Sequence, residues 1–423
     1  MVLSDVGDSS IISGFCFPDE RDFSARNQLD IKLSSRVRRI KPSATLAVTA
    51  LANQLKALGR DVVGLGAGEP DFDTPEHIKQ AAIEAMRAGD TKYTPVDGTV
   101  ALKRAIIEKF HNDNELDYGL DQILVSCGGK QSFYNLCQAM LDAGDEVIIP
   151  APYWVSYPDM ALLADATPVI IPTSQQQGFK ITPEQLRESL TPRTRLVVLN
   201  SPSNPTGAAY NASELKALAE VLMSRPDVIV ATDDMYEHII FEGHTFNNIL
   251  NVCPDLHDRT IVLNGVSKAY AMTGWRIGYA GGPRSLIKAM TNVQSQSTSN
   301  PCSIAQAAAA AALAGDQACV EAMRVAFERR HKYVVAALNE INGVSCLPSA
   351  GTFYCFPSMH GVIERMSGIE DDIALAAHLL DKGGVALVPG AAFGGQGHVR
   401  ISFATDMATL EKAITRIAAA VSQ

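Results

Sequence analysis

One lysine in the chain lies in a loop whose composition suits covalent chemistry. Lys268 stands in the run Ser-Lys-Ala-Tyr-Ala-Met-Thr-Gly-Trp-Arg, residues 267–276, directly after the apolar segment 261–263, which is typical of a buried strand. A lysine amine can form a Schiff base with an aldehyde, and Arg276, eight positions on, can hold a phosphate. Most lysine and arginine pairs in loops are simply solvated, so this interpretation depends on support from other segments.

A second candidate anion site lies where a strand-like run, 123–126, meets a helical segment. Gly129 and Lys130 stand at this junction. The free N–H groups and the positive dipole end of a helix favour an anion such as a phosphate. Glycine before a helix is common for other reasons, so this motif gains weight only together with Arg276.

Two polar motifs follow the next apolar runs along the chain. Asn204 lies in Asn-Pro-Thr-Gly, a proline-bracketed turn that would fix an amide able to donate to a phenolate oxygen; the alternative is a turn that caps the following helix. Asp233 and Asp234 follow the run 228–231, with Tyr236 close behind. A carboxylate at a strand end can pair with a protonated ring nitrogen, and the residues alone leave open which aspartate does so.

Two large side chains, Trp154 and Arg400, lie next to or within apolar segments, so their roles have to be explained. Trp154 follows another strand-like run, where an indole is more often part of the core than a ligand contact. Arg400 interrupts the apolar segment 399–403. A buried arginine needs an anion, which is either the carboxylate of a ligand or an internal salt-bridge partner.

Seven short apolar runs, most of them separated by helical segments, predict an α/β fold with a mostly parallel sheet covered on both faces. Ligands then collect at the carboxyl ends of the strands. The runs are 123–126, 146–149, 168–171, 196–199, 228–231, 261–263 and 277–280. Further strand-like runs at 344–347, 352–356, 385–388 and 399–403 indicate a smaller α+β unit towards the C-terminus.

Composition narrows the function classes. The 423 residues carry a formal net charge of −10, and the only basic cluster is Arg36, Arg38, Arg39 and Lys41, so we expect a local rim of charge and no nucleic-acid partner. Eight scattered cysteines and nine histidines show no metal-ligand spacing, which predicts free thiols and no metal site. No apolar stretch reaches about 20 residues, so no membrane span is expected.

Taken together, Ser-Lys-x5-Gly-x-Arg, Asn-Pro-Thr-Gly and Asp-x-x-Tyr resemble the motifs of the class I aminotransferases, especially the aspartate aminotransferases of the bacterial and plant type. The resemblance covers roughly residues 35–420. It implies the fold type I of pyridoxal phosphate-dependent transferases: a large domain with a mostly parallel seven-stranded sheet plus a smaller α+β domain. The expected division is an N-terminal extension (1–30), a part packing with the small domain (31–75), the large cofactor-binding domain (76–315) and the small C-terminal domain (316–423).

The resemblance also implies cofactor contacts. Lys268 would bind pyridoxal 5'-phosphate covalently and move the proton, Asp233 would support the ring charge, with Asp234 as a solvated or structural neighbour, and Tyr236 would meet the ring oxygen. The other implied cofactor contacts are Asn204 on the same oxygen, Trp154 stacked on the ring, and Gly129, Lys130, Arg276 and Tyr93 of the partner subunit on the phosphate. Gly265 departs from the pattern, because some relatives have a serine there that touches the phosphate.

The implied substrate contacts concern two carboxylates. Arg400, helped by the backbone N–H of Gly68, would clamp the α-carboxylate, and Lys130, with Thr45 and Lys41 near the mouth, would meet the distal one. Trp154 and Asn204 complete the implied substrate site. The segment 294–300 contains no arginine, unlike the animal-type enzymes.

The resulting prediction is an aspartate:2-oxoglutarate aminotransferase acting by ping-pong transamination in amino-acid biosynthesis. The alternatives are a bifunctional aspartate/prephenate aminotransferase, which would form arogenate, and, on the same fold, a C–S lyase or decarboxylase. A non-catalytic regulator would more often lack Lys268 or Asp233. We expect small amino-acid and keto-acid substrates, a homodimer with shared active sites, and a cytoplasmic location, with a plastid as the alternative.

Overall fold

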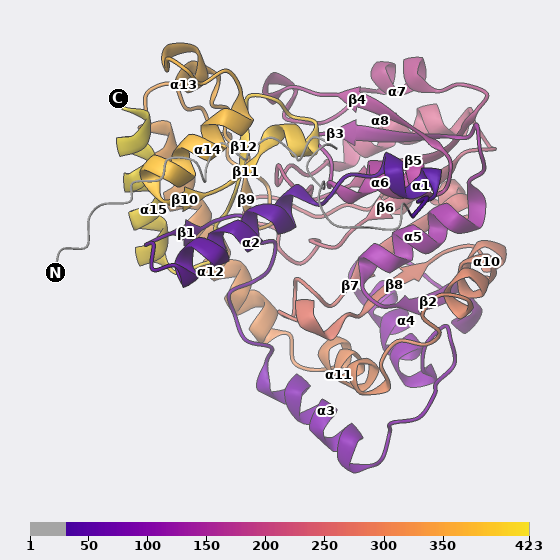
Figure 1. The fold of residues 1–423 in the computed structure, drawn as a ribbon. Coiled ribbons are helices and arrows are strands. Elements are labelled where there is room, and N and C mark those ends of the chain that lie inside the picture. The colour runs from indigo at the N-terminus through magenta and orange to yellow at the C-terminus, as the bar shows by residue number, and fades with distance from the viewer. Residues whose placement is uncertain (1–30, 423) are drawn as a thin grey trace.

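The computed structural model describes residues 31–422, and its centre is a seven-stranded sheet (Figure 1). The strand order is β2 (Ile123–Ser126), β8 (Gly278–Gly281), β7 (Thr260–Gly265), β6 (Ile229–Asp233), β5 (Thr194–Asn200), β3 (Glu146–Ala151) and β4 (Thr167–Pro172). Strand β8 runs antiparallel to β2 and β7, whereas the other neighbours are parallel. The predicted α/β architecture with a mostly parallel seven-stranded sheet is confirmed, and each of the seven apolar runs contributes one strand.

Helices cover both faces of this sheet, because successive strand residues point to opposite sides. Val197 packs in one buried cluster and its neighbour Leu196 in another. The first cluster includes residues of α4 (Val100–Asn114), α8 (Ala212–Met223), α11 (Ser303–Ala314) and α3 (Glu76–Arg87). The second includes residues of α5 (Gly129–Met140), α6 (Ser156–Leu163) and α10 (Arg284–Ser295).

A separate buried cluster organises the C-terminal part of the chain. Its helices are α12 (Ala318–Asn339), α13 (His360–Arg365), α14 (Asp372–Gly383) and α15 (Met407–Val421), and its three-stranded antiparallel sheet has the order β11 (Val388–Pro389), β12 (Val399–Ser402), β9 (Tyr354–Cys355). The N-terminal strand β1 (Val63–Gly64) pairs with β10 (Val385–Ala386), and α2 (Ala44–Ala57) packs beside them. The remaining helices are α1 (Ser35–Arg39), α7 (Pro183–Ser189) and α9 (Ile249–Val252). The exact domain boundaries stay a prediction, and the proposed extension 1–30 lies outside the described residues.

Two predicted strands of the smaller unit were wrong in detail. The run 344–347 is not a strand and contributes only the isolated bridge between Ser345 and Ser358. The run 385–388 divides, because Ala386 pairs with Gly64 in one sheet while Val388 pairs with Arg400 in another. A short apolar run cannot by itself reveal such a change of partner.

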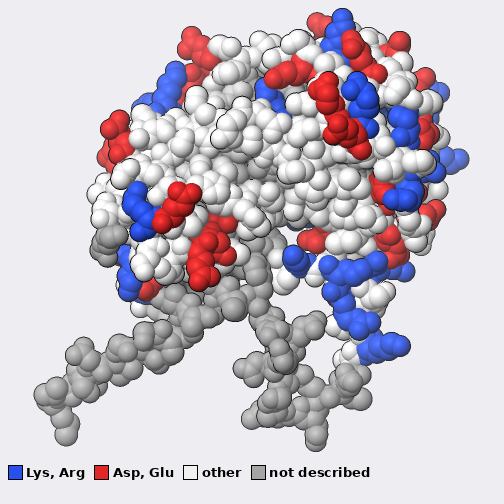
Figure 2. Space-filling view, turned by 90° about the horizontal axis from the view of Figure 1, so that it is seen from above, with Lys and Arg blue, Asp and Glu red and all other residues white. Residues whose placement is uncertain are grey.

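The surface bears acidic and basic side chains interspersed over much of the face in Figure 2, with one basic group gathered at an edge. Within the N-terminal basic cluster, Arg36 and Arg39 both form ion pairs with Asp165 at the end of α6, which fits the predicted local role. Among residues 31–422, no helix is both long and apolar enough to cross a bilayer.

Candidate functional site

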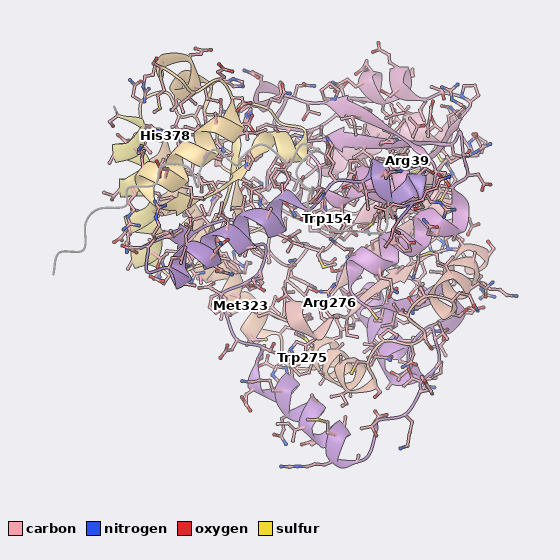
Figure 3. The ribbon with its side chains drawn as sticks, viewed as in Figure 1. Arg39, Trp154, Trp275, Arg276, Met323 and His378 are labelled. Atoms are coloured by element: carbon pink, nitrogen blue, oxygen red, sulfur yellow. The ribbon has the colours of Figure 1, made fainter. Side chains whose placement is uncertain are left out.

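A pocket of about 390 Å³ opens where the parallel strands end. All of the residues predicted for the site line it except Lys41 and Tyr93: Thr45, Gly68, Gly129, Lys130, Trp154, Asn204, Asp233, Tyr236, Lys268, Arg276 and Arg400. Figure 3 places Trp154 and Arg276 near the middle of the molecule, on segments far apart in the sequence. The fold therefore collects side chains from the N-terminal segment, the central sheet and the C-terminal strands.

Lys268 lies in the loop after β7, and its amine is buried. Its Nζ atom donates a hydrogen bond to the carbonyl oxygen of Gly68 at 2.5 Å. Burial lowers the pKa of Lys268 to about 8, helped by the charges of Arg400 and Arg276 and opposed by those of Glu69 and Asp233. A lysine with this pKa is neutral far more often at pH 7 than an ordinary one, so it can act as a nucleophile or as a base.

Asp233 ends β6 and faces the pocket. Its carboxylate accepts hydrogen bonds from the Tyr157 hydroxyl and from the Met235 amide, the latter at 3.3 Å. Burial raises the pKa of Asp233, and these hydrogen bonds and the charge of Lys268 only partly oppose that effect. A protonated ring nitrogen beside it would supply a compensating positive charge.

Asp234 does not line the pocket, whereas its neighbour Asp233 does. It is 1% exposed and accepts hydrogen bonds from Thr232 at 2.6 Å and from Asn248 at 2.5 Å. Burial, followed by the nearby charge of Glu237, raises the pKa of Asp234 to about 8. Of the two roles considered for it, the solvated one was wrong, because its side chain belongs to the core.

Asn204 and Tyr236 present polar groups to the same side of the pocket. The Oδ1 atom of Asn204 accepts a hydrogen bond from Nη1 of Arg400 at 2.9 Å, which leaves its Nδ2 group as the donor available to a ligand. The hydroxyl of Tyr236 lies 3.1 Å from that of Tyr354. An acceptor oxygen could therefore be bound from two directions.

An anion cradle is formed by the start of α5 and by Arg276. Arg276 has a left-handed backbone (φ 58°), and its guanidinium donates to the carbonyl oxygens of Thr273 at 2.8 Å and Cys127 at 3.3 Å. A Cβ atom at Gly128 would overlap that guanidinium, so only glycine allows this close approach. The guanidinium and the helix start suit a phosphate.

Lys130 lies on the first turn of α5 with its Nζ atom 5.2 Å from the centre of the Trp154 ring. Burial lowers the pKa of Lys130, as does the charge of Arg276, while Asp159 opposes them. Lys130 is thus one of four cationic side chains that line the pocket, with Lys268, Arg276 and Arg400. A ligand with two anionic groups could therefore bind a different cation with each of them.

Arg400 is the most buried cation of the pocket, at 2% exposure. Its guanidinium donates to Gly66 O at 2.7 Å, besides the bond to Asn204, and stacks on Tyr354 at 4.4 Å. Within residues 31–422, no carboxylate lies within 4.0 Å of it, and its Nε atom has no partner. The part of the chain that the structure describes therefore contains no internal salt bridge to Arg400, and a bound anion would offset the cost of burying this charge.

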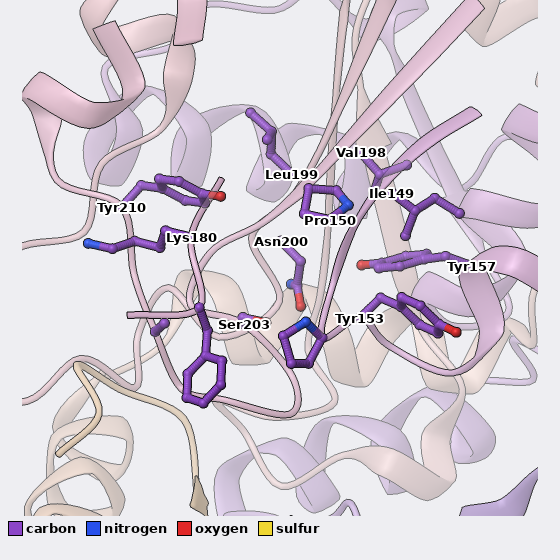
Figure 4. Close-up of a pocket in the computed structure, with 13 residues that line it drawn as sticks. Ile149, Pro150, Tyr153, Tyr157, Lys180, Val198, Leu199, Asn200, Ser203 and Tyr210 are labelled. Carbon is purple, nitrogen blue, oxygen red and sulfur yellow. The ribbon is translucent and has the colours of Figure 1, made fainter. Parts of the chain in front are cut away.

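Several residues that line the pocket or contact its side chains were not predicted from the sequence. The Tyr157 hydroxyl donates a hydrogen bond to Asp233, and Oδ1 of Asn200 accepts one from the backbone N–H of Asn204 at 2.8 Å. Tyr354 contacts both Tyr236 and Arg400. Asn200 lines the pocket, and both Asn200 and Tyr157 line a smaller cavity of about 20 Å³ (Figure 4). Their only sequence signal was proximity to a predicted residue, since Tyr157 follows Trp154 by three positions.

Two of the predicted residues do not line the pocket, and a third position, Gly265, is crowded by its neighbours. Tyr93 is 91% exposed between α3 and α4. Lys41 lies between α1 and α2, where its charge opposes the burial that raises the pKa of Asp159. Gly265 has little room for a side chain, because a Cβ atom would lie 3.0 Å from Ile277 O and 3.1 Å from Gly278 Cα.

No cluster of three or more histidine, cysteine or carboxylate side chains suited to a metal occurs between residues 31 and 422. The seven described cysteines are free thiols: Cys127, Cys137, Cys253, Cys302, Cys319, Cys346 and Cys355.

Residues 60–417 match the family model described as aminotransferase class I and II. The chain belongs to this family. The aspartate/prephenate aminotransferase of Nitrosomonas europaea is 58% identical over 93% of this chain and 100% of its own length. The aspartate aminotransferase of Geobacillus stearothermophilus is 51% identical over 92% and 98%.

Solved aminotransferase structures agree with this assignment. The aspartate aminotransferase from Rhizobium meliloti has a TM-score of 0.90 at 50% identity, covering 93% of this chain and 99% of its own. The aspartate aminotransferase from Thermus thermophilus with maleate has a TM-score of 0.87 at 44% identity, covering 92% and 100%. The protein is thus an aminotransferase of fold type I, and members of this class use pyridoxal phosphate.

Proposed function

We propose that Lys268 is the residue that binds pyridoxal phosphate and then moves the substrate's proton. The cofactor supplies an aldehyde that joins the amino group and a ring that takes up electrons from Cα. The observation that carries the proposal is the position of a buried amine, with a pKa lowered to about 8 chiefly by burial, in a pocket with Asp233 and Arg276. Once its own amine is free, Lys268 Nζ takes the proton from Cα.

The other residues around Lys268 fit a cofactor of this shape. Arg276 and the N–H groups at the start of α5 would hold its phosphate, and Asp233 would keep its ring nitrogen protonated. Asn204 Nδ2 and the Tyr236 hydroxyl would donate to its ring oxygen. Trp154, which lines the same pocket, would stack on the ring.

We infer that the substrates are aspartate and 2-oxoglutarate. Arg400 lacks a carboxylate partner among residues 31–422 and suits the α-carboxylate, beside Gly68. Lys130 and Thr45 line the same pocket and suit the distal carboxylate, with Lys41 nearer the mouth. The names of the Nitrosomonas europaea and Geobacillus stearothermophilus relatives support aspartate, and the Thermus thermophilus enzyme has been solved with maleate, a dicarboxylate.

Prephenate is the second candidate acceptor. It is favoured by the Nitrosomonas europaea relative and by the aspartate/prephenate aminotransferase of Cereibacter sphaeroides, which is 56% identical over 92% of this chain. A panel that offers oxaloacetate, 2-oxoglutarate and prephenate to the amine form of the enzyme tests both proposals. Return of the absorbance with 2-oxoglutarate but not prephenate would support the narrower specificity. No change of the aldehyde form with aspartate or glutamate, and none of the amine form with any of the three keto acids, would reject the assignment.

We further propose a homodimer in which Tyr93 reaches the partner's cofactor phosphate. Its 91% exposure, outside the pocket of its own chain, supports this role. The mass of the protein in solution tests the dimer directly. A cytoplasmic location is also proposed, consistent with the free thiols between residues 31 and 422, and cell fractionation tests it.

A further inference from the structure

The turn after β6 has two faces, and only one belongs to the pocket. Asp233 and Tyr236 line the pocket. Asp234 and Glu237 point the other way and are 1% and 6% exposed. The roles proposed above use the first pair and leave two buried carboxyl groups directly behind them without a function.

Glu237, on the turn after β6, uses its two carboxylate oxygen atoms to bind side chains of α4 and β7. Lys109 of α4 forms an ion pair with Oε1, and Asn114, at the end of α4, donates to Oε2 at 2.6 Å. Asn264, near the end of β7, donates its Nδ2 to Oε1 at 2.6 Å. All four side chains are 6% exposed or less, so the network is almost entirely shielded from water.

The network continues toward Lys268 through one further bond. Because Asn264 gives its Nδ2 group to Glu237, its Oδ1 atom faces back and accepts the N–H of Gly265 at 2.7 Å. Gly265 begins the loop that carries Lys268, and it packs closely against Ile277. We therefore expect a substitution of Glu237 to alter the position of the Lys268 loop as well as that of its own turn.

We propose that Glu237, held by Lys109, is a positioning residue that fixes the Asp233 turn relative to the Lys268 loop through Asn264. Burial alone would raise the pKa of Glu237, but the charge of Lys109 and the surrounding donors bring it below the ordinary value. The ion pair is thus charged and fully bonded, a geometry in which removing one partner is costly. This inference rests on the proposed function of Lys268.

The test compares two substitutions that each remove a carboxylate paired with a buried lysine of α4. Glu237→Gln removes the buried carboxylate partner of Lys109, which keeps only Asp113 at 3.9 Å, and puts an amide N–H against one of the donors Asn114 and Asn264. Asp97→Asn is the matched control, because it leaves the buried Lys103 of α4 without its 2.5 Å partner but does not touch the turn or the loop. Both variants are prepared as holoenzymes.

The readouts are the pH at which the absorbance of the Lys268-bound cofactor changes and the dissociation constant of the cofactor. We expect Glu237→Gln to shift that pH by about half a unit or more and to raise the dissociation constant about tenfold, with Asp97→Asn near wild type. If both variants lose stability and neither readout moves, Glu237 is only structural and the inference is wrong. If the wild type binds no cofactor at Lys268, it is the proposed function that fails.

Asn264→Ala provides a second variant should Glu237→Gln fail to fold, since it leaves the ion pair between Lys109 and Glu237 in place and removes the two Asn264 hydrogen bonds, to Glu237 and to Gly265. The same direction of shift is expected from it, and an unchanged pH midpoint would overturn the link. If both single variants fold, the double variant should shift the pH midpoint no further than the larger of the two single shifts. Both substitutions interrupt the same path of hydrogen bonds, so their effects should not add. Additive shifts would contradict a route through Asn264.

Discussion

Arg400 donates a hydrogen bond from Nη1 to Oδ1 of Asn204 at 2.9 Å, although the two residues are 196 positions apart. One contact therefore orients both the cation proposed for the α-carboxylate and the amide proposed for the ring oxygen. Binding of substrate at Arg400 and binding of cofactor at Asn204 are expected to be coupled, since neither side chain can turn without losing the bond.

Arg400→Lys should weaken amino-acid binding more than it harms the fold. Lysine keeps the charge but loses the planar fork, so it cannot bind Asn204, Gly66 and a carboxylate together. We expect kcat/KM for aspartate to fall roughly ten- to hundredfold, mainly through KM. Steady-state kinetics at saturating cofactor measure this, and an unchanged KM would argue against the clamp.

The two adjacent aspartates should respond in opposite ways to the same substitution. Asp233→Asn removes the carboxylate that faces the pocket and should lower kcat on the order of a hundredfold or more. Asp234→Asn should retain activity, because Asp234, with a pKa of about 8, is mostly protonated at neutral pH and its partners are bound as well by an amide. Activity in both variants, or in neither, would refute the division of roles.

Asp234 also predicts a pH dependence of stability. Its pKa in the folded protein, about 8, lies above the ordinary 3.8, so between these values the folded state keeps a proton that the unfolded chain has lost. The stability contributed by this group is complete below pH 3.8 and is lost as the pH rises through about 8. Urea unfolding at about pH 5 and about pH 9 should show a smaller difference in Asp234→Asn than in the wild type.

Lys268 should be unusually reactive in the cofactor-free protein. With its pKa lowered to about 8, mainly by burial, its modification by an amine-specific reagent should rise with pH and reach half its maximum near pH 8. Exposed lysines should titrate at higher pH, as their ordinary value of 10.5 requires. Peptide mapping by mass spectrometry follows each site, and a midpoint for Lys268 near 10 would contradict the lowered pKa.

Lys130→Met should separate dicarboxylic from monocarboxylic substrates. The substitution keeps an apolar stem beside Trp154 but removes the charge proposed for the distal carboxylate. We expect kcat/KM for aspartate to fall about tenfold or more, and that for alanine or phenylalanine to change much less. An equal loss for both classes would assign Lys130 to the cofactor phosphate alone.

Mixed dimers can test the position of Tyr93. Lys268→Ala and Tyr93→Ala subunits, each impaired alone, should form a mixed dimer with one intact site if Tyr93 serves the partner's pocket. Mixing should then restore cofactor affinity at up to one site per mixed dimer, measured by absorbance titration after subunit exchange. No recovery on mixing, with exchange verified, would show that each chain uses its own Tyr93.

Much of the fold and site follows from local sequence. Each of the seven apolar runs became a strand, because a short apolar run between helical segments is most readily buried in a sheet that helices cover on both faces. Asn204, Asp233 and Lys268 were predictable because each closely follows such a run, and parallel strands bring their carboxyl ends to one edge. The family motifs added the identity of the ligand.

The tertiary structure alone decided which buried charges have internal partners. From the sequence, Arg400 could pair with a carboxylate, only the family resemblance distinguished Asp233 from Asp234, and Lys109 and Glu237 showed no relationship. The fold left Arg400 without a carboxylate in the described chain, turned Asp234 into the core and joined Lys109 to Glu237. The reason is physical: the cost of a buried charge depends on the atoms that surround it in three dimensions, and chain position does not specify those atoms.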